Sequence, residues 1–538
     1  MAKPLFIFLL FTLSLSAAEP PSAACKSTPH RQLCLSILSA FRRSPPSNPP
    51  QTYARFSLNQ CLNHSKKLSN SIADFVAGKL LLSDPEIAAL SDCRQLHELS
   101  AEYLELVSGE LVGPAAANLS EAAVSRVRSL LSAVVTNQET CSDGLAEAGS
   151  GIGGALLLGD AAAVYSVSLG LVTHALGRGR RSGAGAGAGR RGAVELDWPR
   201  SEFFEMIHLP NKGRILDELW EQGIQANATV TVSPYGGANF TSIGDAVASA
   251  PNNSAVEDGY FVIYARQGYY QEYVVVPRHK KNIMLIGDGI NATVVTGNRS
   301  VVDGWTTFNS ATFIVYGERF VAMGISFENT AGPEKHQAVA VRNSADISTF
   351  YRCSMAGYQD TLYAHSLRQF YRECDISGTV DFIFGNAAAI FQSCRLYGRT
   401  PLPNQKVAFT AQGRSDPNQN TGISIHNCTV VGEAGAEASY LGRPWKQYSR
   451  TVYMESYIGE MINPVGWLEW NDTAGLDTLY YGEYQNYGPG SGTSMRVNWP
   501  GYTIMNATQA LNFTVFNFTM GETWLPSTNI PFDAGLLH

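Results

Sequence analysis

The sequence predicts two domains of different fold class, an all-α bundle over residues 19–175 and an all-β solenoid over residues 227–538. In the first half Ala and Leu abound, and apolar residues recur at spacings of three and four, which is typical of amphipathic helices. In the second half short runs of Val, Ile, Phe, Tyr and Thr recur roughly every twenty residues, a spacing that favours stacked β coils. Between the halves the composition shifts to glycine and arginine.

The helical stripes are clearest at seven positions, and Asn118-Leu-Ser-Glu121 offers a cap before one of the helices. These positions are Leu96, Leu104, Leu111, Val124, Val127, Leu131 and Val134. Ahead of the bundle, residues 1–18 carry Lys3, an apolar run from Leu5 to Leu15 and then small residues, which predicts a cleaved signal peptide. The run is too short to span a bilayer. Together with twelve Asn-x-Ser/Thr sequons, it predicts a secreted, extracellular glycoprotein.

Residues 176–226 form the linker. Its alternation of Gly and Ala between arginine pairs, from Arg178 to Arg191, cannot pack a core. Paired arginines in an exposed segment are natural sites for a processing protease, although a linker that is never cut fits equally well.

Five runs in the second half predict strands, and residues 243–250 predict a helix. The runs are 261–264, 273–276, 282–286, 311–315 and 451–454. A solenoid needs covered ends, which this helix and the irregular C-terminal tail can supply. Periodicity alone leaves a β-sandwich or a propeller open.

Charge and cysteine usage exclude several classes of protein. The formal net charge is −7, which argues against nucleic acid as a partner. The nine cysteines suit an oxidising compartment, and their spacing matches no zinc site. No other stretch has the length and apolarity of a membrane span.

Two aspartates stand in apolar, strand-like runs one coil apart. Asp360 lies in Tyr358-Gln-Asp-Thr-Leu362, and Asp381 lies in Val380-Asp-Phe-Ile-Phe384. Buried carboxylates need a cation, hydrogen-bond donors or a proton. In a paired site one acid can stay protonated while its neighbour stays charged.

Three further residues complete this candidate site. Arg443, in Leu441-Gly-Arg-Pro-Trp445, is the candidate cation, and Trp445 offers a face for a sugar ring. The side-chain amides of Gln337 and Gln359 can stabilise a transient oxyanion. Taken singly, each residue could be structural, as a turn cap or a buried ladder residue; their joint occurrence favours a catalytic site. No serine lies in a G-x-S-x-G turn.

Ordered motifs give residues 227–535 a strong resemblance to the plant pectin methylesterases (pectinesterases). They are Gly268-Tyr-Tyr-Gln-Glu272, Asn329-Thr-Ala-Gly-Pro333, Gln337-Ala-Val-Ala340, Gln359-Asp360, Asp381-Phe-Ile-Phe-Gly385 and Leu441-Gly-Arg-Pro-Trp445. Residues 25–175 resemble the pectin methylesterase inhibitor domain, through Cys25-Lys-Ser-Thr-Pro, Cys34, Asp92-Cys93 and Thr140-Cys141-Ser-Asp. The resemblance implies a proenzyme with a four-helix bundle and a right-handed parallel β-helix.

By this resemblance the protein demethylates pectin to pectate and methanol, with no metal or other cofactor. Asp381 is the nucleophile that forms an acyl-enzyme, and Asp360 is the proton donor. Gln337 and Gln359 hold the oxyanion, and Arg443 orients Asp381. The residues that the resemblance places against substrate are Thr307, Gln337, Tyr363, Phe384, Arg443 and Trp445.

The resemblance also implies partners and disulfides. The partners are homogalacturonan, a proteinaceous pectin methylesterase inhibitor and a processing protease, and the chain is expected to be a monomer. The implied disulfides are Cys374–Cys394 in the solenoid and Cys25–Cys34 and Cys93–Cys141 in the bundle, with Cys61 left as a thiol and Cys353 and Cys428 unassigned. The family's Arg-Arg-Leu-Leu processing motif is replaced here by diluted basic segments, among them Lys212-Gly-Arg-Ile-Leu216.

Two other functions compete with esterase activity. A glycosidase also uses two catalytic carboxylates. Methanol release without new reducing ends would indicate an esterase and not a glycosidase. A non-enzymatic pectin-binding or inhibitory protein is the third hypothesis, which the presence of all five core positions disfavours.

Overall fold

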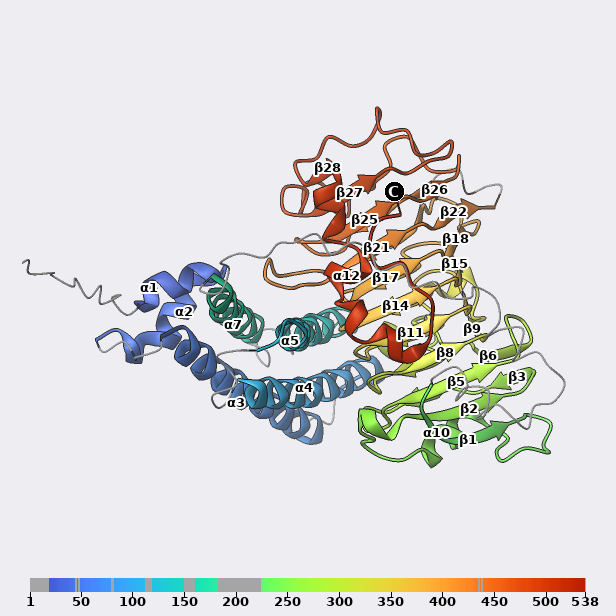
Figure 1. Ribbon diagram of the computed structural model, residues 1–538, viewed down its shortest axis with the longest axis horizontal. Helices are drawn as coiled ribbons and strands as arrows, with labels where there is room; N and C mark the ends of the chain where they lie inside the picture. Colours follow the sequence, from blue (N-terminus) through green and yellow to red (C-terminus); the bar gives the residue numbers. More distant parts are fainter. Residues whose placement is uncertain are drawn as a thin grey trace, which may run out of the picture.

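The computed structural model describes residues 19–43, 46, 49–78, 82–111, 119–149, 160–181, 224–433, 436 and 439–537. An N-terminal helical bundle, residues 19–181, lies against one side of a β solenoid that begins at residue 226 (Figure 1). The predicted signal peptide and the basic segments at 190–191 and 212–216 lie outside the described residues.

The bundle is built on four long helices, preceded by two short ones. They are α1 (Pro21–Ala24), α2 (Arg31–Ile37), α3 (Pro49–Gly78), α4 (Asp84–Glu110), α5 (Glu121–Glu147) and α7 (Ala161–Arg181). The predicted stripes are largely right, since Leu96, Leu104 and Leu131 are buried in one shared core. Ser120 caps α5 by accepting a hydrogen bond from the Ala123 amide at 3.2 Å. Helix α7 runs six residues past position 175, into the segment predicted as linker.

Two disulfides pin the bundle, Cys25–Cys34 and Cys93–Cys141, and both pairings agree with the prediction. Cys61 is a buried free thiol, also as predicted. In the described ranges, no helix combines the length and the apolar character needed to cross a membrane.

The solenoid is a parallel β-helix with three long faces, and every strand pairing between its coils is parallel. The 11-stranded sheet contains β1 (Ala226–Val232), β2 (Tyr260–Ala265), β5 (Ile283–Gly287), β8 (Val321–Met323), β11 (Ser348–Tyr351), β14 (Arg368–Arg372), β17 (Ala388–Gln392), β21 (Gly422–His426), β25 (Arg450–Met454), β27 (Tyr480–Tyr484) and β28 (Tyr502–Ile504). The 8-stranded sheet contains β3 (Gly268–Gln271), β6 (Thr293–Gly297), β9 (Ser326–Asn329), β12 (Ser354–Ala356), β15 (Asp375–Gly378), β18 (Arg395–Gly398), β22 (Thr429–Gly432) and β26 (Tyr457–Ile458).

The third face is a 7-stranded sheet, which carries the candidate site. Its strands are β4 (Val274–Val276), β7 (Phe313–Val315), β10 (Val341–Asn343), β13 (Leu362–Ala364), β16 (Ile383–Gly385), β20 (Thr410–Gln412) and β24 (Arg443–Pro444). A two-stranded sheet joins β19 (Val407–Ala408) to β23 (Ser439–Tyr440). Each coil visits the 11-, 8- and 7-stranded sheets in turn, so one position recurs on the same face in successive coils. The prediction of stacked coils is therefore confirmed, and the sandwich and the propeller are excluded.

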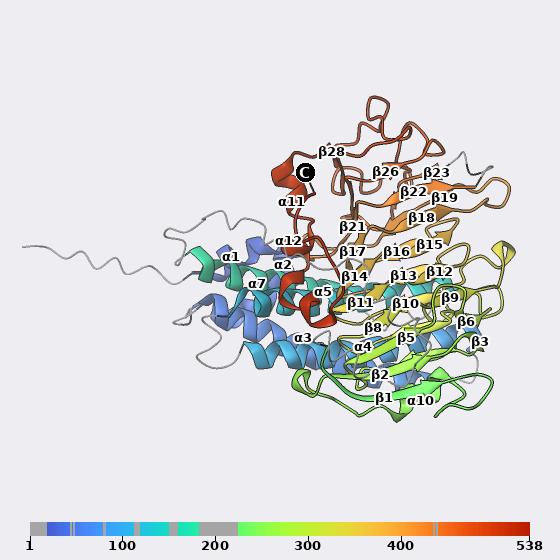
Figure 2. The same ribbon diagram turned by 45° about the vertical axis from the view of Figure 1, so that its right-hand side comes forward.

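The predicted helix covers the first coils of the solenoid, whereas the C-terminal tail does not lie where the prediction placed it. Helix α10 (Ile243–Ser249) is the predicted helix, and its Ile243 and Val247 join the solenoid core beside the first strands. The C-terminal tail instead lies along the outer face of the 11-stranded sheet, as Figure 2 shows for α11 (Ala507–Leu511) and α12 (Val515–Phe518). Trp524 and Leu525 pack there because this face is apolar across several coils.

The prediction of a Cys374–Cys394 disulfide is wrong in this structure, where both are buried free thiols. With Cys353 and Cys428 they form a column. Each of the four cysteines directly precedes a strand of the 8-stranded sheet, and these strands pair with one another in successive coils. The Cys374 amide donates to the Cys394 sulfur at 3.5 Å, and the Cys394 amide donates to the Cys428 sulfur at 3.3 Å. Every member thus has a neighbour, which is why sequence spacing does not single out one pair.

Candidate active site

The two aspartates lie side by side at the start of neighbouring strands of the 7-stranded sheet. Strand β13 pairs with β16 in the register Leu362 to Ile383, so the residues two positions earlier, Asp360 and Asp381, stack one coil apart. The Asp360 amide donates to the Val380 carbonyl at 3.0 Å, which fixes this stacking. The juxtaposition expected from the sequence is present in the structure.

Both aspartates adopt left-handed backbone conformations, with φ of 63° at Asp360 and 52° at Asp381. Most side chains are strained there, but Asp and Asn tolerate the conformation better than other non-glycine residues. The chain turns sharply at each aspartate before entering its strand. This turn lets both carboxyls project from the coil while the backbone hydrogen bonds continue into the sheet.

Arg443, on β24, holds Asp381 with two parallel hydrogen bonds. Its Nε donates to Oδ1 at 2.7 Å and its Nη2 donates to Oδ2 at 2.6 Å. Such a bidentate pair fixes the position of the carboxylate as well as its charge. The Arg443 guanidinium also lies 4.3 Å from the ring centroid of Trp470, whose face supports it. Trp470 was not predicted from the sequence, because it belongs to no motif and lies in an irregular segment.

The environment separates the protonation states of the two acids. Burial, then the negative charge of Asp381 and that of Glu147, raises the pKa of Asp360 well above its ordinary value, and Arg443 opposes them only in part. Burial also raises the pKa of Asp381, but the hydrogen bonds and the charge of Arg443 counteract it. Asp360 is therefore the acid that keeps its proton, and Asp381 is the one that ionises.

The two predicted amide donors flank this pair. The Ala338 amide donates to the Gln359 carbonyl at 3.3 Å, which brings Gln337 and Gln359 onto adjacent coils. Within the described part of the chain, neither side-chain amide has a hydrogen-bond partner. Donors without partners in the resting protein can be used by a charge that develops during a reaction.

An aromatic floor extends from the carboxyl pair across the 7-stranded sheet. Tyr363 stacks on Phe384 with ring centroids 4.2 Å apart, and Trp445 lies 5.9 Å from Phe384. The ring centroid of Phe308 lies 6.4 Å from that of Tyr363. Phe308 follows Thr307 in a short 3-10 helix, η6 (Thr307–Asn309). Three of the residues predicted to touch substrate, Tyr363, Phe384 and Trp445, therefore lie together on this floor, and Thr307 lies at its edge beside Phe308.

Helix α5 of the bundle lies on this floor. Thr140 is within hydrogen-bond distance of Tyr363 Oη, at 3.5 Å, and of His365 Nε2, at 3.1 Å. Further along the helix, Glu147 accepts a hydrogen bond from Thr307 at 3.2 Å. Tyr363 and Phe384 share one apolar core with the bundle, so the floor is covered in this structure.

Charged contacts anchor the bundle on either side of the floor. Lys446, next to Trp445, lies 2.5 Å from Asp143 and 3.5 Å from Glu139 on α5. On the other side, Asp92 of α4 accepts a hydrogen bond from Thr306 at 2.5 Å, and burial raises the pKa of Asp92 to about 6. These contacts identify the aromatic floor as the docking surface of the bundle.

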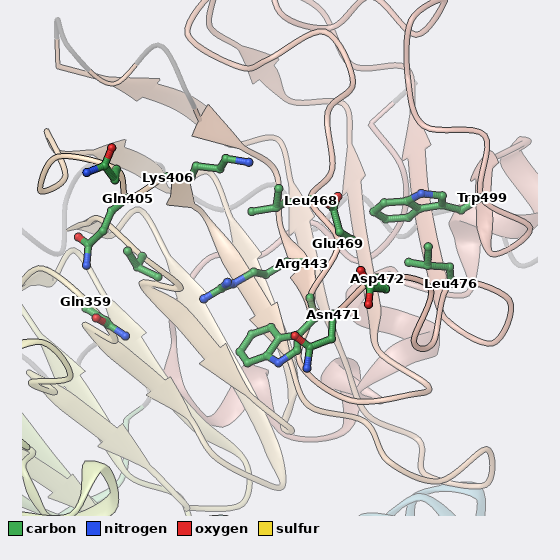
Figure 3. A pocket seen from close by; sticks show the side chains of 13 residues that line it. Gln359, Gln405, Lys406, Arg443, Leu468, Glu469, Asn471, Asp472, Leu476 and Trp499 are labelled. Atoms are coloured by element: carbon green, nitrogen blue, oxygen red, sulfur yellow. The ribbon is translucent and has the colours of Figure 1, made fainter.

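A cavity of about 810 Å³ remains open beside the carboxyl pair (Figure 3). Gln359 and Arg443 line it together with Val380, which precedes Asp381, and with residues that no sequence motif marked. These other lining residues are Asn404, Gln405, Lys406, Leu468, Glu469, Trp470, Asn471, Asp472, Leu476 and Trp499. In the described residues, no three His, Cys, Asp or Glu side chains form a group that could hold a metal ion.

Comparisons with known proteins agree with this geometry. The profile of the family Pectinesterase matches residues 229–522, and that of the family Plant invertase/pectin methylesterase inhibitor matches residues 21–170. Two Arabidopsis thaliana proteins, named Probable pectinesterase/pectinesterase inhibitor 47 and 25, are 55% and 53% identical to this chain. The alignments cover 96% and 97% of this chain and 86% and 87% of those proteins.

The solved structure of pectin methylesterase from carrot is similar to the solenoid. It shares 49% sequence identity with this chain, with a TM-score of 0.56, over 57% of this chain and 98% of the carrot chain. The covered share corresponds to the β-helix without the bundle. The chain therefore belongs to the pectinesterase family, and an inhibitor-like helical domain precedes its β-helix.

Proposed function

We propose that this protein removes methyl esters from the galacturonate units of pectin through an acyl-enzyme on Asp381. The observation that carries the proposal is the buried pair of carboxyls, in which Arg443 holds Asp381 through two hydrogen bonds while burial and neighbouring charges raise the pKa of Asp360 well above its ordinary value. Pectin demethylation is the function of the pectinesterase family. Asp381 is given the role of nucleophile and Asp360 that of proton donor by the family resemblance, and the contacts of both with their neighbours support these roles.

In the first half of the reaction, an oxygen of Asp381 attacks the ester carbonyl carbon. The carbonyl π electrons move to oxygen, and the side-chain amides of Gln337 and Gln359 donate hydrogen bonds to the resulting oxyanion. When the tetrahedral intermediate collapses, the bond to the methoxy oxygen breaks and Asp360 donates its proton. Methanol leaves, and a mixed anhydride joins Asp381 to the galacturonyl carbon.

In the second half, the roles of Asp360 reverse. As a carboxylate it removes a proton from water, and the hydroxide oxygen attacks the anhydride. The carbonyl–Asp381 bond breaks, the galacturonate acid is released, and Asp381 regains its negative charge beside Arg443. A carboxylate is a weak nucleophile, so fixing it in position and stabilising the oxyanion supply most of the acceleration.

Replacing Gln337 by alanine tests the oxyanion assignment. We expect kcat to fall about 100-fold with little change in KM, because one donor to the oxyanion is lost. The fold should persist, since no described residue depends on the Gln337 side chain for a hydrogen bond. Gln271, exposed on β3, provides the control Gln271→Ala, which should match the wild type. Unchanged turnover in Gln337→Ala would remove this residue from the mechanism.

The proposed reaction is tested on highly methylated pectin by measuring methanol and reducing ends together. An esterase releases methanol and leaves the number of reducing ends constant. A glycosidase, which also uses two carboxylates, creates reducing ends without methanol. A pectin-binding protein without activity produces neither.

We further propose that the chain is a secreted proenzyme with a signal peptide over residues 1–18. Residues 19–175 are the inhibitor-like prodomain, residues 176–226 are the processing region and residues 227–538 are the catalytic β-helix. The seating of α5 over Tyr363 and Thr307 supports a role for the bundle in keeping a long polysaccharide off the floor. Processing within the linker would then allow the bundle to leave.

Reversing one charge on α5 tests whether the bundle limits activity. In Asp143→Lys, the new ammonium faces Lys446, which pairs with Asp143 across the interface in the wild type, and such repulsion between like charges weakens docking. We expect methanol release from long pectin to rise about tenfold, which corresponds to roughly 1.4 kcal/mol of lost docking energy. Asp74, exposed on α3, gives the matched control Asp74→Lys. Turnover of Asp143→Lys equal to that of the control would refute the inhibitory role.

A further inference from the structure

A glycosylation sequon borders the open cavity beside the carboxyl pair. Asn471, Asp472 and Thr473 form an Asn-x-Thr sequence in the irregular segment between β26 and β27. The first two of these residues line the cavity (Figure 3). Asn471 directly follows Trp470, whose ring centroid lies 4.3 Å from the Arg443 guanidinium. A group attached to Asn471 therefore begins next to the arginine that holds the catalytic carboxylate.

The backbone presents this sequon on an exposed turn. All three of its residues are exposed, and Asp472 has a left-handed backbone with φ of 46°. The Ala474 amide donates to the Asn471 carbonyl at 3.0 Å, which closes the turn. No described residue forms a hydrogen bond with the side chain of Asn471 or of Thr473. Sequons that accept N-linked glycans lie in surface loops, and this segment has that form.

The other sequons in the described part of the chain are less suited to carry a glycan. In six of them the asparagine side chain already forms a hydrogen bond within the fold; these are Asn239, Asn298, Asn427, Asn506, Asn512 and Asn517. In the sequons that begin at Asn63, Asn227, Asn252 and Asn291, the Ser or Thr is not exposed. Among the described residues, Asn471 is thus the one position where a glycan replaces no internal contact and the whole sequon faces solvent.

We propose that Asn471 carries an N-linked glycan and that this glycan covers the open side of the catalytic cavity. The proposal rests on the secretion and the esterase activity proposed above, because the glycan is attached in the secretory pathway and its effect is measured on pectin. In the attachment step, Nδ2 of Asn471 attacks the anomeric carbon of an N-acetylglucosamine linked to a lipid diphosphate. A C–N bond forms, the bond from that carbon to the diphosphate oxygen breaks, and the amide loses one proton.

The glycan completes the cover that the bundle begins. Helix α5 lies over the aromatic floor through Thr140 and Tyr363, whereas the cavity lined by Gln359 and Arg443 remains open. An N-linked glycan is bulky and hydrated, so it obstructs a long polysaccharide more than a short oligomer. The glycan is also covalent, so it still restricts approach from the Asn471 side after the bundle has left. We therefore expect it to lower kcat/KM for pectin and to leave kcat/KM for short oligomers nearly unchanged.

Mass spectrometry of glycopeptides from the full-length chain, secreted by plant cells, tests the modification. We expect the peptide that contains Asn471 to carry the mass of an N-linked glycan. Thr473→Ala should abolish the modification because the acceptor sequence needs a hydroxyl, whereas the matched control Thr473→Ser keeps an acceptor sequence and should keep the glycan. An unmodified Asn471 peptide from the wild type would overturn the proposal.

Methanol release by the same three proteins tests the covering role. We expect kcat/KM of Thr473→Ala for long methylated pectin to be about fivefold above that of the wild type and of Thr473→Ser. With a methylated trigalacturonate all three proteins should agree. In chains produced by a bacterial host that attaches no N-linked glycan, Thr473→Ala and the wild type should also agree on long pectin.

Equal turnover of long pectin by the glycosylated wild type and by Thr473→Ala would overturn the covering role. A difference between the two that persists in the bacterial proteins would overturn it as well, because the effect would then belong to the threonine side chain. A glycan on Asn471 of a chain that releases no methanol would support the modification site and refute the esterase function instead, so the two failures are distinguishable.

Discussion

Replacing Asp381 by asparagine is expected to abolish methanol release, with a fall in kcat of at least about 10⁴-fold. Asparagine retains the shape of the side chain and tolerates the backbone φ of 52° at this position. It loses the negative charge, so it can neither attack the ester nor form the bidentate ion pair with Arg443. The effect is therefore chemical and not a consequence of misfolding.

Methanol production at saturating pectin measures this change, and circular dichroism and thermal unfolding check the fold. The matched control is Asp245→Asn, which alters an exposed aspartate on α10 far from the groove. Activity of Asp381→Asn within tenfold of the control would show that another group is the nucleophile.

Replacing Asp360 by asparagine should lower kcat about 10³-fold, within the range that general acid–base catalysis supplies. The amide can still donate a hydrogen bond to the departing methoxy oxygen, but it cannot transfer a proton to it or take one from water. Burial, then the negative charges of Asp381 and Glu147, raise the pKa of Asp360 well above its ordinary value, which favours the protonated acid that this step needs.

The pH dependence distinguishes this role from a structural one. In the wild type, acylation should slow as the pH rises through the raised pKa of Asp360, because the proton needed by methanol is lost. It should also slow at low pH, where Asp381 takes up a proton. Asp360→Asn should lose the alkaline fall and keep the acidic one. A variant with the wild-type pH profile would contradict the assignment of Asp360 as the acid.

The sequence predicted the carboxyl pair because its geometry is local to the solenoid repeat. Asp360 and Asp381 are separated by one coil, and parallel pairing of β13 with β16 converts that separation into contact. Arg443 is 62 residues from Asp381 along the chain. Strand β20 lies between their two strands, so only the motif, and not the period, pointed to this contact.

The cysteine pairing and the position of the C-terminal tail could not be predicted from local sequence patterns. Four cysteines stand in one column, and both Cys374 and Cys394 have a second cysteine neighbour besides each other, so the predicted Cys374–Cys394 bond had no physical advantage. The C-terminal tail packs against apolar side chains of several strands on the outer face of the 11-stranded sheet. This apolar face exists only once the strands have assembled, so no single run of the sequence predicts it.

The docking of the bundle was not predictable from either domain alone. Its contacts use small polar residues such as Ser132, which lies in no motif, and Thr140, whose motif marks the inhibitor-like domain and not the surface on which it docks. The open cavity likewise joins two irregular segments, around Lys406 and Glu469, that become neighbours only after the coils have stacked.

Trapping the acyl-enzyme tests the central claim most directly. A methyl-esterified oligogalacturonate is mixed with the enzyme, the reaction is quenched with acid during steady-state turnover, and the peptides are analysed by mass spectrometry. The account predicts a galacturonyl adduct on the peptide that contains Asp381, absent from Asp381→Asn. Turnover without any adduct on that peptide, or an adduct on Asp360, would contradict it.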